Sequence, residues 1–156
     1  SVSILPIARA CQAACRFCFS EASVSSEQSA SAQCLSTWET ACAQARERGA
    51  QRFVITGGGE PGLLPHAQML ALIRTGRAHF DKGVLISNGV HLARLDEADR
   101  RARLRDYAQA GLRTLAISRH HHDAAINQAI MGLDTRTERV LHSWQALRDE
   151  VDLRQE

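Results

Sequence analysis

The sequence predicts an α/β fold with a parallel sheet, because short apolar segments that suit strands alternate with longer segments that suit helices. Strands joined through helices form right-handed crossovers, which make neighbouring strands parallel. A second observation agrees with this fold. The most unusual residues of the chain directly follow the expected strands, and the carboxyl ends of parallel strands are where such sheets place functional groups.

Length and composition indicate one ordinary globular domain. The chain has 156 residues, enough for a hydrophobic core. Its 19 basic and 17 acidic residues leave a net charge of +2, too small to indicate nucleic acid or an acidic membrane as a partner. No apolar run approaches membrane-spanning length, and residues 2–8 are too short and wrongly flanked for a signal peptide. We therefore expect a cytoplasmic protein.

The first third of the chain contains one expected strand and one expected helix. Apolar residues alternate with small or polar ones over residues 1–8, and Pro6 suits an edge strand. Residues 20–33 are rich in Ser, Ala, Gln and Glu, so we expect a flexible loop there, or one that only a ligand or partner orders. A capping box at residues 36–39 predicts the start of a helix that ends at Gly49.

The rest of the chain repeats the strand–helix unit. Pro65 suits the first turn of a helix, Gly111 and Gly132 suit helix ends, and Asp123 suits a helix start. Thr135 and Glu138 form another capping box. The expected elements are strands at 52–56, 83–87 and 112–118, helices at 65–80, 96–110, 124–131 and 135–149, and the start of a fifth strand at 151–154.

Three cysteines, Cys11, Cys15 and Cys18, follow the first expected strand with C-x3-C-x2-C spacing. Three close thiolates can hold one inorganic centre. A structural zinc site needs a fourth protein ligand, for which Cys34 or His66 is the candidate. A four-iron cluster with three cysteines instead keeps one iron open. The spacing alone leaves both readings open, whereas an odd total of five cysteines disfavours a disulfide framework.

A run of glycines, residues 57–59, directly follows the second expected strand and leads into Glu60 and Pro61. Glycines let a ligand approach the backbone closely, or allow a turn with positive φ. The run lacks the Gly-Lys-Ser/Thr of a phosphate-binding loop and the spacing of a dinucleotide fingerprint. By itself it predicts either a tight turn or a ligand cradle.

Polar residues also follow the third and fourth expected strands. Asn88 comes after the third strand, while Ser118 and Arg119 end the fourth and precede three histidines, residues 120–122. Consecutive side chains diverge, so a metal site is disfavoured there. Two interpretations of this segment are open. Either one of His120, His121 and His122 faces the active site, or the segment is a polar loop without a functional histidine.

Two further groups are interpreted as structural. Cys34 and Cys42 lie on the first expected helix and suit buried apolar positions. The arginines of the helix at 96–110 alternate with acidic residues and spread around it, which predicts a solvated outer face. These arginines are Arg100, Arg101, Arg103 and Arg105.

Taken together, the cysteine motif, with Phe17 before its last cysteine, and the strand that ends in Gly-Gly-Glu-Pro resemble the radical S-adenosylmethionine (radical SAM) superfamily. The resemblance runs from about Ile4 to the end of the chain. It implies a [4Fe-4S] cluster on Cys11, Cys15 and Cys18, with the amine and carboxylate of SAM on the fourth iron. It also implies further SAM contacts from Gly57, Gly58, Gly59, Glu60, Asn88, Ser118 and Arg119.

The resemblance further implies a chemistry and its partners. An electron donor such as flavodoxin or ferredoxin reduces the cluster, SAM is cleaved, and a 5′-deoxyadenosyl radical abstracts hydrogen from an unidentified substrate, with a peptide or small metabolite favoured. The alternative is a non-catalytic zinc- or iron–sulfur-binding domain that acts in interaction or electron transfer.

The implied fold is a partial TIM-like barrel of (βα)n units. The family core has six such units, whereas this sequence offers about four and the start of a fifth, so residues 1–156 match the N-terminal portion of that core. We expect a missing C-terminal segment or a partner chain to complete the barrel.

Overall fold

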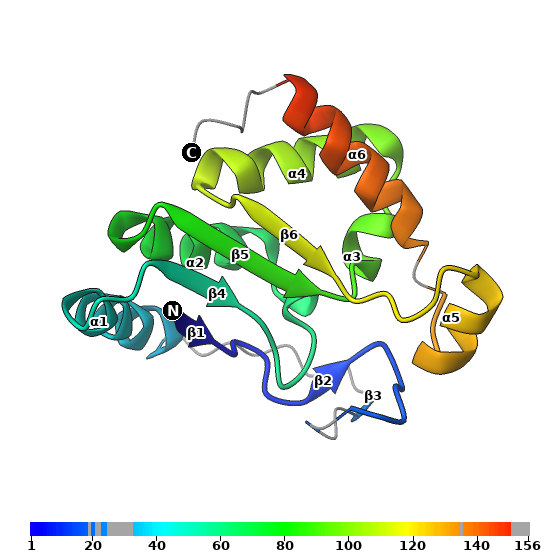
Figure 1. The fold of residues 1–156 in the computed structure, drawn as a ribbon, viewed down its shortest axis with the longest axis horizontal. Coiled ribbons are helices and arrows are strands. Elements are labelled where there is room, and N and C mark those ends of the chain that lie inside the picture. Colours follow the sequence, from blue (N-terminus) through cyan, green and yellow to red (C-terminus); the bar gives the residue numbers. More distant parts are fainter. Residues whose placement is uncertain (19, 21–22, 25–32, 135, 151–156) are drawn as a thin grey trace.

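The structure is a computed structural model that describes residues 1–18, 20, 23–24, 33–134 and 136–150. Only the backbone is described at residues 23–24, 33–34 and 150. A four-stranded parallel sheet forms the centre of the molecule, and a second sheet of two short strands lies beyond one end of it (Figure 1).

The main sheet has the order β1-β4-β5-β6 with every neighbouring pair parallel, which confirms the predicted α/β class. One row across the sheet pairs Ile4, Ile55, Leu85 and Leu115. The described strands form an open sheet with β1 and β6 at its edges, and they do not close into a barrel. The strands are β1 (Val2–Ile4), β4 (Arg52–Ile55), β5 (Lys82–Ser87) and β6 (Thr114–Ile117).

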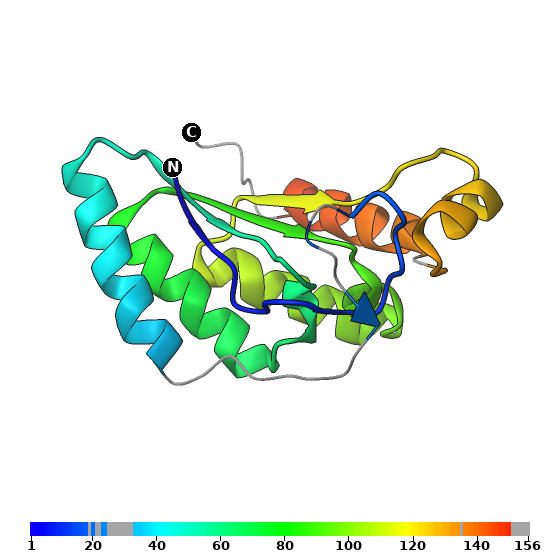
Figure 2. The same cartoon turned by 90° about the horizontal axis from the view of Figure 1, so that it is seen from below.

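Three helices cover one face of this sheet: α1 (Gln33–Glu47), α2 (His66–His79) and α4 (Glu97–Ala110) (Figure 2). Buried side chains from these helices and from the facing side of the sheet form most of the core, and residues 92–93 and Val140, Trp144 and Leu147 add to it. On the other face, which no described helix covers, Val54 and Val84 are half-buried and Ile86 is 38% exposed. Among the described helices, none combines the length and apolarity needed to cross a bilayer.

The remaining helices lie nearer the carboxyl ends of the strands. The short helices η1 (Pro61–Leu63) and α3 (Val90–Ala93) follow β4 and β5, and the sequence did not predict them. Helix α6 (Thr137–Glu150) packs against α4 and α3. Helix α5 (Ala124–Met131) stands apart at the end of the molecule (Figure 1).

Several helix ends were predicted correctly because a local side chain determines them. The Asp96 carboxylate accepts a hydrogen bond from the Asp99 N–H at 2.9 Å and starts α4. Asp123 starts α5 in the same way. Gly111 and Gly132 end these helices with φ of 116° and 63°, in the left-handed region that glycine tolerates best.

Other predicted boundaries were wrong. Helix α1 begins at Gln33, before the predicted capping box, so Ser36 lies inside the helix. Its backbone carbonyl accepts a hydrogen bond from the Thr40 hydroxyl at 3.1 Å. Gly49 nevertheless follows α1 with φ of 83°, as predicted. Strand β1 is shorter than the expected segment at residues 1–8. Thr135 and the fifth strand lie outside the described residues, and α6 begins at Thr137.

The predicted flexible loop at residues 20–33 contains a short strand. Strand β3 (Ser23–Val24) pairs in parallel with β2 (Ala10–Cys11) and forms the second sheet. The loop prediction is therefore wrong at these two residues. Within the predicted loop, Ser20 lies outside any strand, and Gln33, the last residue of the range, is the first residue of α1. The other residues of the range lie outside the described residues.

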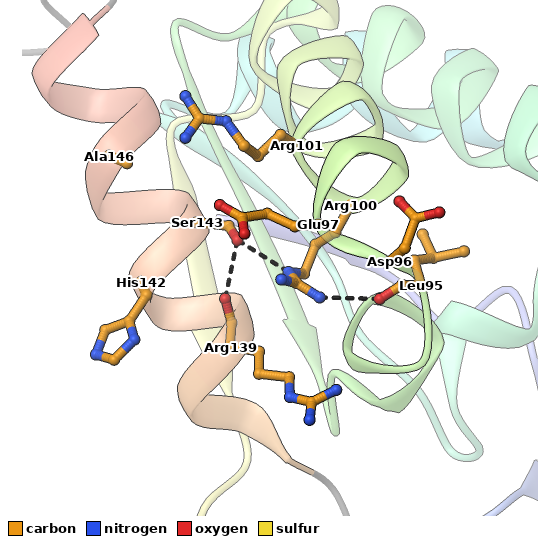
Figure 3. A pocket seen from close by; sticks show the side chains of 9 residues that line it. All are labelled: Leu95, Asp96, Glu97, Arg100, Arg101, Arg139, His142, Ser143 and Ala146. Atoms are coloured by element: carbon orange, nitrogen blue, oxygen red, sulfur yellow. Dashed lines mark hydrogen bonds between the residues drawn. The ribbon is translucent and has the colours of Figure 1, made fainter.

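Arg100 corrects the prediction of a wholly solvated arginine face. It is only 6% exposed, and its guanidinium donates to the Ser143 hydroxyl and the Leu95 carbonyl, both at 2.9 Å (Figure 3). It lines a cavity of about 580 Å³ between α4 and α6. The sequence predicted a surface position for Arg100, whereas its side chain connects α4 to α6.

Candidate functional site

The three cysteines of the predicted motif lie in and after strand β2, near the carboxyl end of the main sheet (Figure 1). All three are half-buried free thiols. A turn joins the last two, since the Cys18 N–H donates to the Cys15 carbonyl at 3.0 Å. The structure thus places three unpaired thiols on one compact loop.

Burial raises the pKa of Cys11 and Cys15, the nearby Cys18 thiol raises both further, and Cys11 also raises the pKa of Cys15. Two donors offset part of this increase at Cys11: the Ala13 N–H, which lies 3.4 Å from Cys11 Sγ, and the Asn88 side-chain amide. Clustered thiolates are therefore unfavourable here unless a positive centre offsets their charge. A metal bound to this loop would supply that charge.

The sequence left two candidate centres open for these three thiols, a zinc ion and a four-iron cluster. Within the described residues, no three His, Cys, Asp or Glu side chains are arranged to hold a single metal ion. Tetrahedral zinc needs all its ligands about 2.0–2.3 Å from one ion, whereas a four-iron cluster takes each thiolate on a different iron. His66, a candidate zinc ligand, instead lies 2.8 Å from Asp106, and the Cys34 side chain lies outside the described residues. Three thiols are a donor set that suits a four-iron cluster, and the cluster at this loop stays a prediction.

The glycine loop runs alongside the segment that enters the cysteine loop. Three backbone hydrogen bonds join them: Thr56 N–H to the Ile4 carbonyl and Gly59 N–H to the Ile7 carbonyl at 3.0 Å, and Glu60 N–H to the Ala10 carbonyl at 2.8 Å. The glycine loop and the cysteine loop are thus neighbours, as their positions after adjacent strands predict.

Two of the glycines are required by this close approach. A Cβ atom at Gly58 would overlap the Ala8 carbonyl oxygen, and one at Gly59 would overlap that of Ala10. The structure therefore explains the glycines through the packing of two backbones. A contact between this loop and a cofactor stays a prediction.

Glu60 is a buried carboxylate, 3% exposed, that faces the protein. Its Oε1 accepts the Gly62 N–H and the Ser87 hydroxyl, both at 2.6 Å, and its Oε2 accepts the Asn88 N–H at 2.7 Å. Burial raises its pKa, and these three donors act in the opposite direction. The side chain thereby ties the glycine loop to the end of β5, a role that the sequence did not predict.

Asn88 lies against the cysteine loop, as expected for a site residue. Its Nδ2 donates to Gln12 Oε1 at 3.2 Å and lies 3.8 Å from Cys11 Sγ. Its Oδ1 accepts the Val90 N–H at 3.0 Å. The structure thus brings Asn88, Glu60 and Cys11 together.

Ser118 and Arg119 lie at the end of β6. The Ser118 N–H donates to the Ser87 carbonyl at 2.8 Å and extends the pairing with β5. The Arg119 guanidinium donates to the Thr137 hydroxyl at 3.2 Å and forms an ion pair with Glu138 of α6. A cofactor carboxylate could bind Arg119 only by sharing or displacing these partners.

Of the three histidines, His120 is the one with a contact to the cysteine loop among the described residues. The His120 ring makes an edge-to-face contact with Phe17, with 4.6 Å between ring centroids. The His121 Nδ1 accepts the Asp123 N–H at 3.0 Å, and its ring stacks on His122. His120 is therefore the candidate for a functional role.

Comparison with known protein families agrees with this site. The model of the radical SAM superfamily matches residues 5–152, most of the chain. The chain belongs to the radical SAM superfamily. No curated protein matched the sequence. Membership indicates a radical SAM-type enzyme and confirms the resemblance drawn from the two motifs.

One contact of the radical SAM cysteine loop comes from a backbone atom that no sequence motif marks. The Ala14 N–H donates to the Met131 carbonyl at 2.8 Å. The Cys15 Sγ lies 3.9 Å from the same oxygen. The end of α5 therefore touches the loop between the first two cysteines.

A buried histidine supports the turn behind the radical SAM glycine motif. The His91 Nδ1 is buried and has no hydrogen-bond partner among the described residues, while its Nε2 lies 3.5 Å from the Tyr107 hydroxyl. Burial, with a smaller contribution from Arg103, lowers the pKa of His91 to about 4. A Cβ at Gly62 would overlap this ring. A neutral His91 thus packs directly under the turn after Glu60.

Proposed function

We propose that this radical SAM chain holds a [4Fe-4S] cluster on Cys11, Cys15 and Cys18 and uses SAM as its second cofactor. One observation carries the proposal: three free, half-buried thiols share a loop that packs against the glycine motif. The loop offers three thiols to a cluster with four irons, so one iron stays open for SAM. When bound, this pair of cofactors supplies reductive cleavage of SAM and a carbon radical for hydrogen abstraction.

The chain's own residues would bind and orient these groups. The cysteines would hold the cluster as thiolates, and their partial burial would limit the access of water. Asn88 places a polar amide beside Cys11, where it can contact the cluster sulfur or the amino-acid part of SAM. Residues 57–59 offer backbone groups, and Ser118 and Arg119 offer polar groups at the end of strand β6.

The uncovered face of the sheet suits a role in substrate binding. Val54, Val84 and Ile86 lie on this face, which would line the interior of a completed barrel. We propose that a later segment or a partner chain completes this enclosure around a peptide or a small metabolite. A separate electron donor such as flavodoxin or ferredoxin would reduce the cluster.

Anaerobic reconstitution with iron and sulfide tests the cluster assignment. The protein should bind about four irons and become brown. Cys11→Ala, Cys15→Ala and Cys18→Ala should each lose most of this iron. Cys42→Ala is the matched control, because Cys42 is a fully buried thiol in the core and belongs to no predicted site. Equal iron loss in the control, or stoichiometric zinc in place of iron, would contradict the proposal.

A further inference from the structure

Helix α5 (Ala124–Met131) is held mainly by its ends. It stands apart from the other helices (Figure 1), and most of its side chains are exposed, including Ile126 at 46%. Its buried residues are Asn127 and Met131. With so little side-chain packing, the contacts at these two residues must largely determine where the helix lies.

Asn127 attaches α5 to the loop after β6. This side chain is 3% exposed, and its Oδ1 accepts the backbone N–H groups of His120 at 2.8 Å and His121 at 3.3 Å. Arg119 secures the same loop, because it donates to the His121 carbonyl at 3.0 Å and pairs with Glu138. The first turn of α5 is therefore connected to the main sheet.

Met131 and Gly132 attach the other end of α5 to the cysteine loop. The last carbonyls of a helix have no partner within the helix, and the Ala14 N–H satisfies that of Met131 at 2.8 Å. Gly132 has φ of 63°, and a Cβ atom there would lie 3.0 Å from the Ala14 Cβ. Cys15, the next residue of the cysteine loop, is 116 residues from Met131 in the sequence, so the contact joins distant segments of the chain.

We infer that Met131 and Gly132 are positioning residues for the cluster: they hold Ala14, and with it the spacing of Cys11 and Cys15, before iron binds. Ala14 lies between these two cysteines, so fixing its backbone restricts both thiols. A loop that is already in place loses less conformational entropy when it binds a ligand. The inference rests on the proposed function, because it assigns a cluster to these cysteines.

Gly132→Ala tests the inference against Gly49→Ala. Both changes place a Cβ at positive φ, 63° and 83°, but no atom lies within 4 Å of a Cβ at Gly49. Both variants should lose similar stability from backbone strain. Only Gly132→Ala should release iron to a chelator faster, by roughly 10-fold, as is usual when a supporting contact of a metal ligand is lost.

Hydrogen exchange of the Ala14 amide in the metal-free protein gives a second readout, independent of activity. The amide should be protected in the unsubstituted protein and in Gly49→Ala, and should exchange faster in Gly132→Ala. Adding Ala14→Gly to Gly132→Ala removes the opposing Cβ and should restore both protection and iron retention. If Gly132→Ala fails to fold, Asn127→Ala should accelerate iron release by loosening the other end of α5.

The outcomes separate the two claims. A protein that binds no four-iron cluster contradicts the proposed function and removes the inference with it. A protein that binds the cluster, but loses iron at the same rate in Gly132→Ala and Gly49→Ala, overturns the inference alone. Rapid exchange of the Ala14 amide in the unsubstituted protein would also overturn it.

Discussion

The buried carboxylate of Glu60 accepts the backbone N–H of Asn88 at 2.7 Å, across the ends of two neighbouring strands. Asn88 in turn points its side-chain amide at the cysteine loop. Glu60 also accepts the Gly62 N–H within its own loop. One carboxylate therefore connects the glycine motif, strand β5 and, through Asn88, the cysteines.

Replacing Glu60 should destabilise the protein strongly. Glu60→Ala leaves three buried donors unsatisfied and should lower the free energy of unfolding by about 3–5 kcal/mol. Glu60→Gln should cost about 1–3 kcal/mol, because its NH₂ group would oppose one of the three donors. Denaturant unfolding monitored by circular dichroism measures both changes.

Glu39→Gln serves as the control for Glu60→Gln, because Glu39 is exposed on α1 and its carboxylate pairs with His79 at the surface. The control should change stability by about 0.5 kcal/mol or less. Equal effects in the two variants would show that the Glu60 carboxylate has no special structural role.

His91 should make stability depend on pH below neutrality. Its pKa falls from 6.5 to about 4 on folding, so protonation favours the unfolded chain. The stabilising contribution is complete above pH 6.5 and decreases as the pH falls from 6.5 towards 4, by at most about 3 kcal/mol. Urea unfolding at a series of pH values measures this dependence.

His91→Gln should flatten that pH profile, because glutamine does not titrate. His142→Gln is the matched control, since His142 is exposed on α6. The control should keep the slope of the unsubstituted protein between pH 6.5 and 4. An unchanged slope in His91→Gln would show that His91 is not the group responsible.

Gly58→Ala should disturb the contact between the glycine and cysteine loops. The new methyl group would overlap the Ala8 carbonyl oxygen, so the backbone must move. We expect a loss of about 2 kcal/mol or more in stability and weaker iron retention. Unfolding and iron-release experiments should therefore both respond, whereas Gly49→Ala, with open space around it, should affect stability alone. Unchanged iron retention in Gly58→Ala would show that iron binding by the cysteine loop does not depend on its contact with the glycine loop.

Arg100 should contribute to the packing of α4 against α6. Arg100→Ala removes the donors to Ser143 and Leu95 and should cost about 2–4 kcal/mol. Arg105→Ala, at an exposed position of the same helix, should cost about 0.5 kcal/mol or less. Thermal and denaturant unfolding would reveal this difference, and equal effects would contradict the structural role of Arg100.

The parts of the fold that the sequence predicted are those set by local chemistry. Helix α5 was predicted to the residue because Asp123 caps its start and Gly132 ends it. The four main strands were found because each contains a short apolar segment, and three of them are followed by a helix as the next element. The capping box at Ser36 misled because α1 extends further towards the N-terminus, so Ser36 is an interior helix residue.

The parts that the sequence could not predict depend on distant neighbours. The burial of Arg100 depends on α6, which lies some forty residues later in the chain. The resemblance implied that Glu60 contacts SAM, but it gave no role to the Glu60 side chain, whose partners Ser87 and Asn88 lie 27 and 28 residues later in the chain. The contact from Ala14 to Met131 uses backbone atoms alone, so no residue type signals it.

The sequence gives the most specific site prediction where the residue type itself limits the chemistry. Three closely spaced cysteines allow few functions, and the structure places all three on one loop beside Asn88. The three histidines allowed many functions, and only the contact with Phe17 distinguishes His120.

The most direct test of the account is the electron paramagnetic resonance spectrum of the reduced, reconstituted protein with and without SAM. We predict that SAM shifts the signal of a four-iron cluster, because it binds the iron that Cys11, Cys15 and Cys18 leave open, and that 5′-deoxyadenosine accumulates. A signal that saturating SAM leaves unchanged, with no 5′-deoxyadenosine formed, would contradict the account.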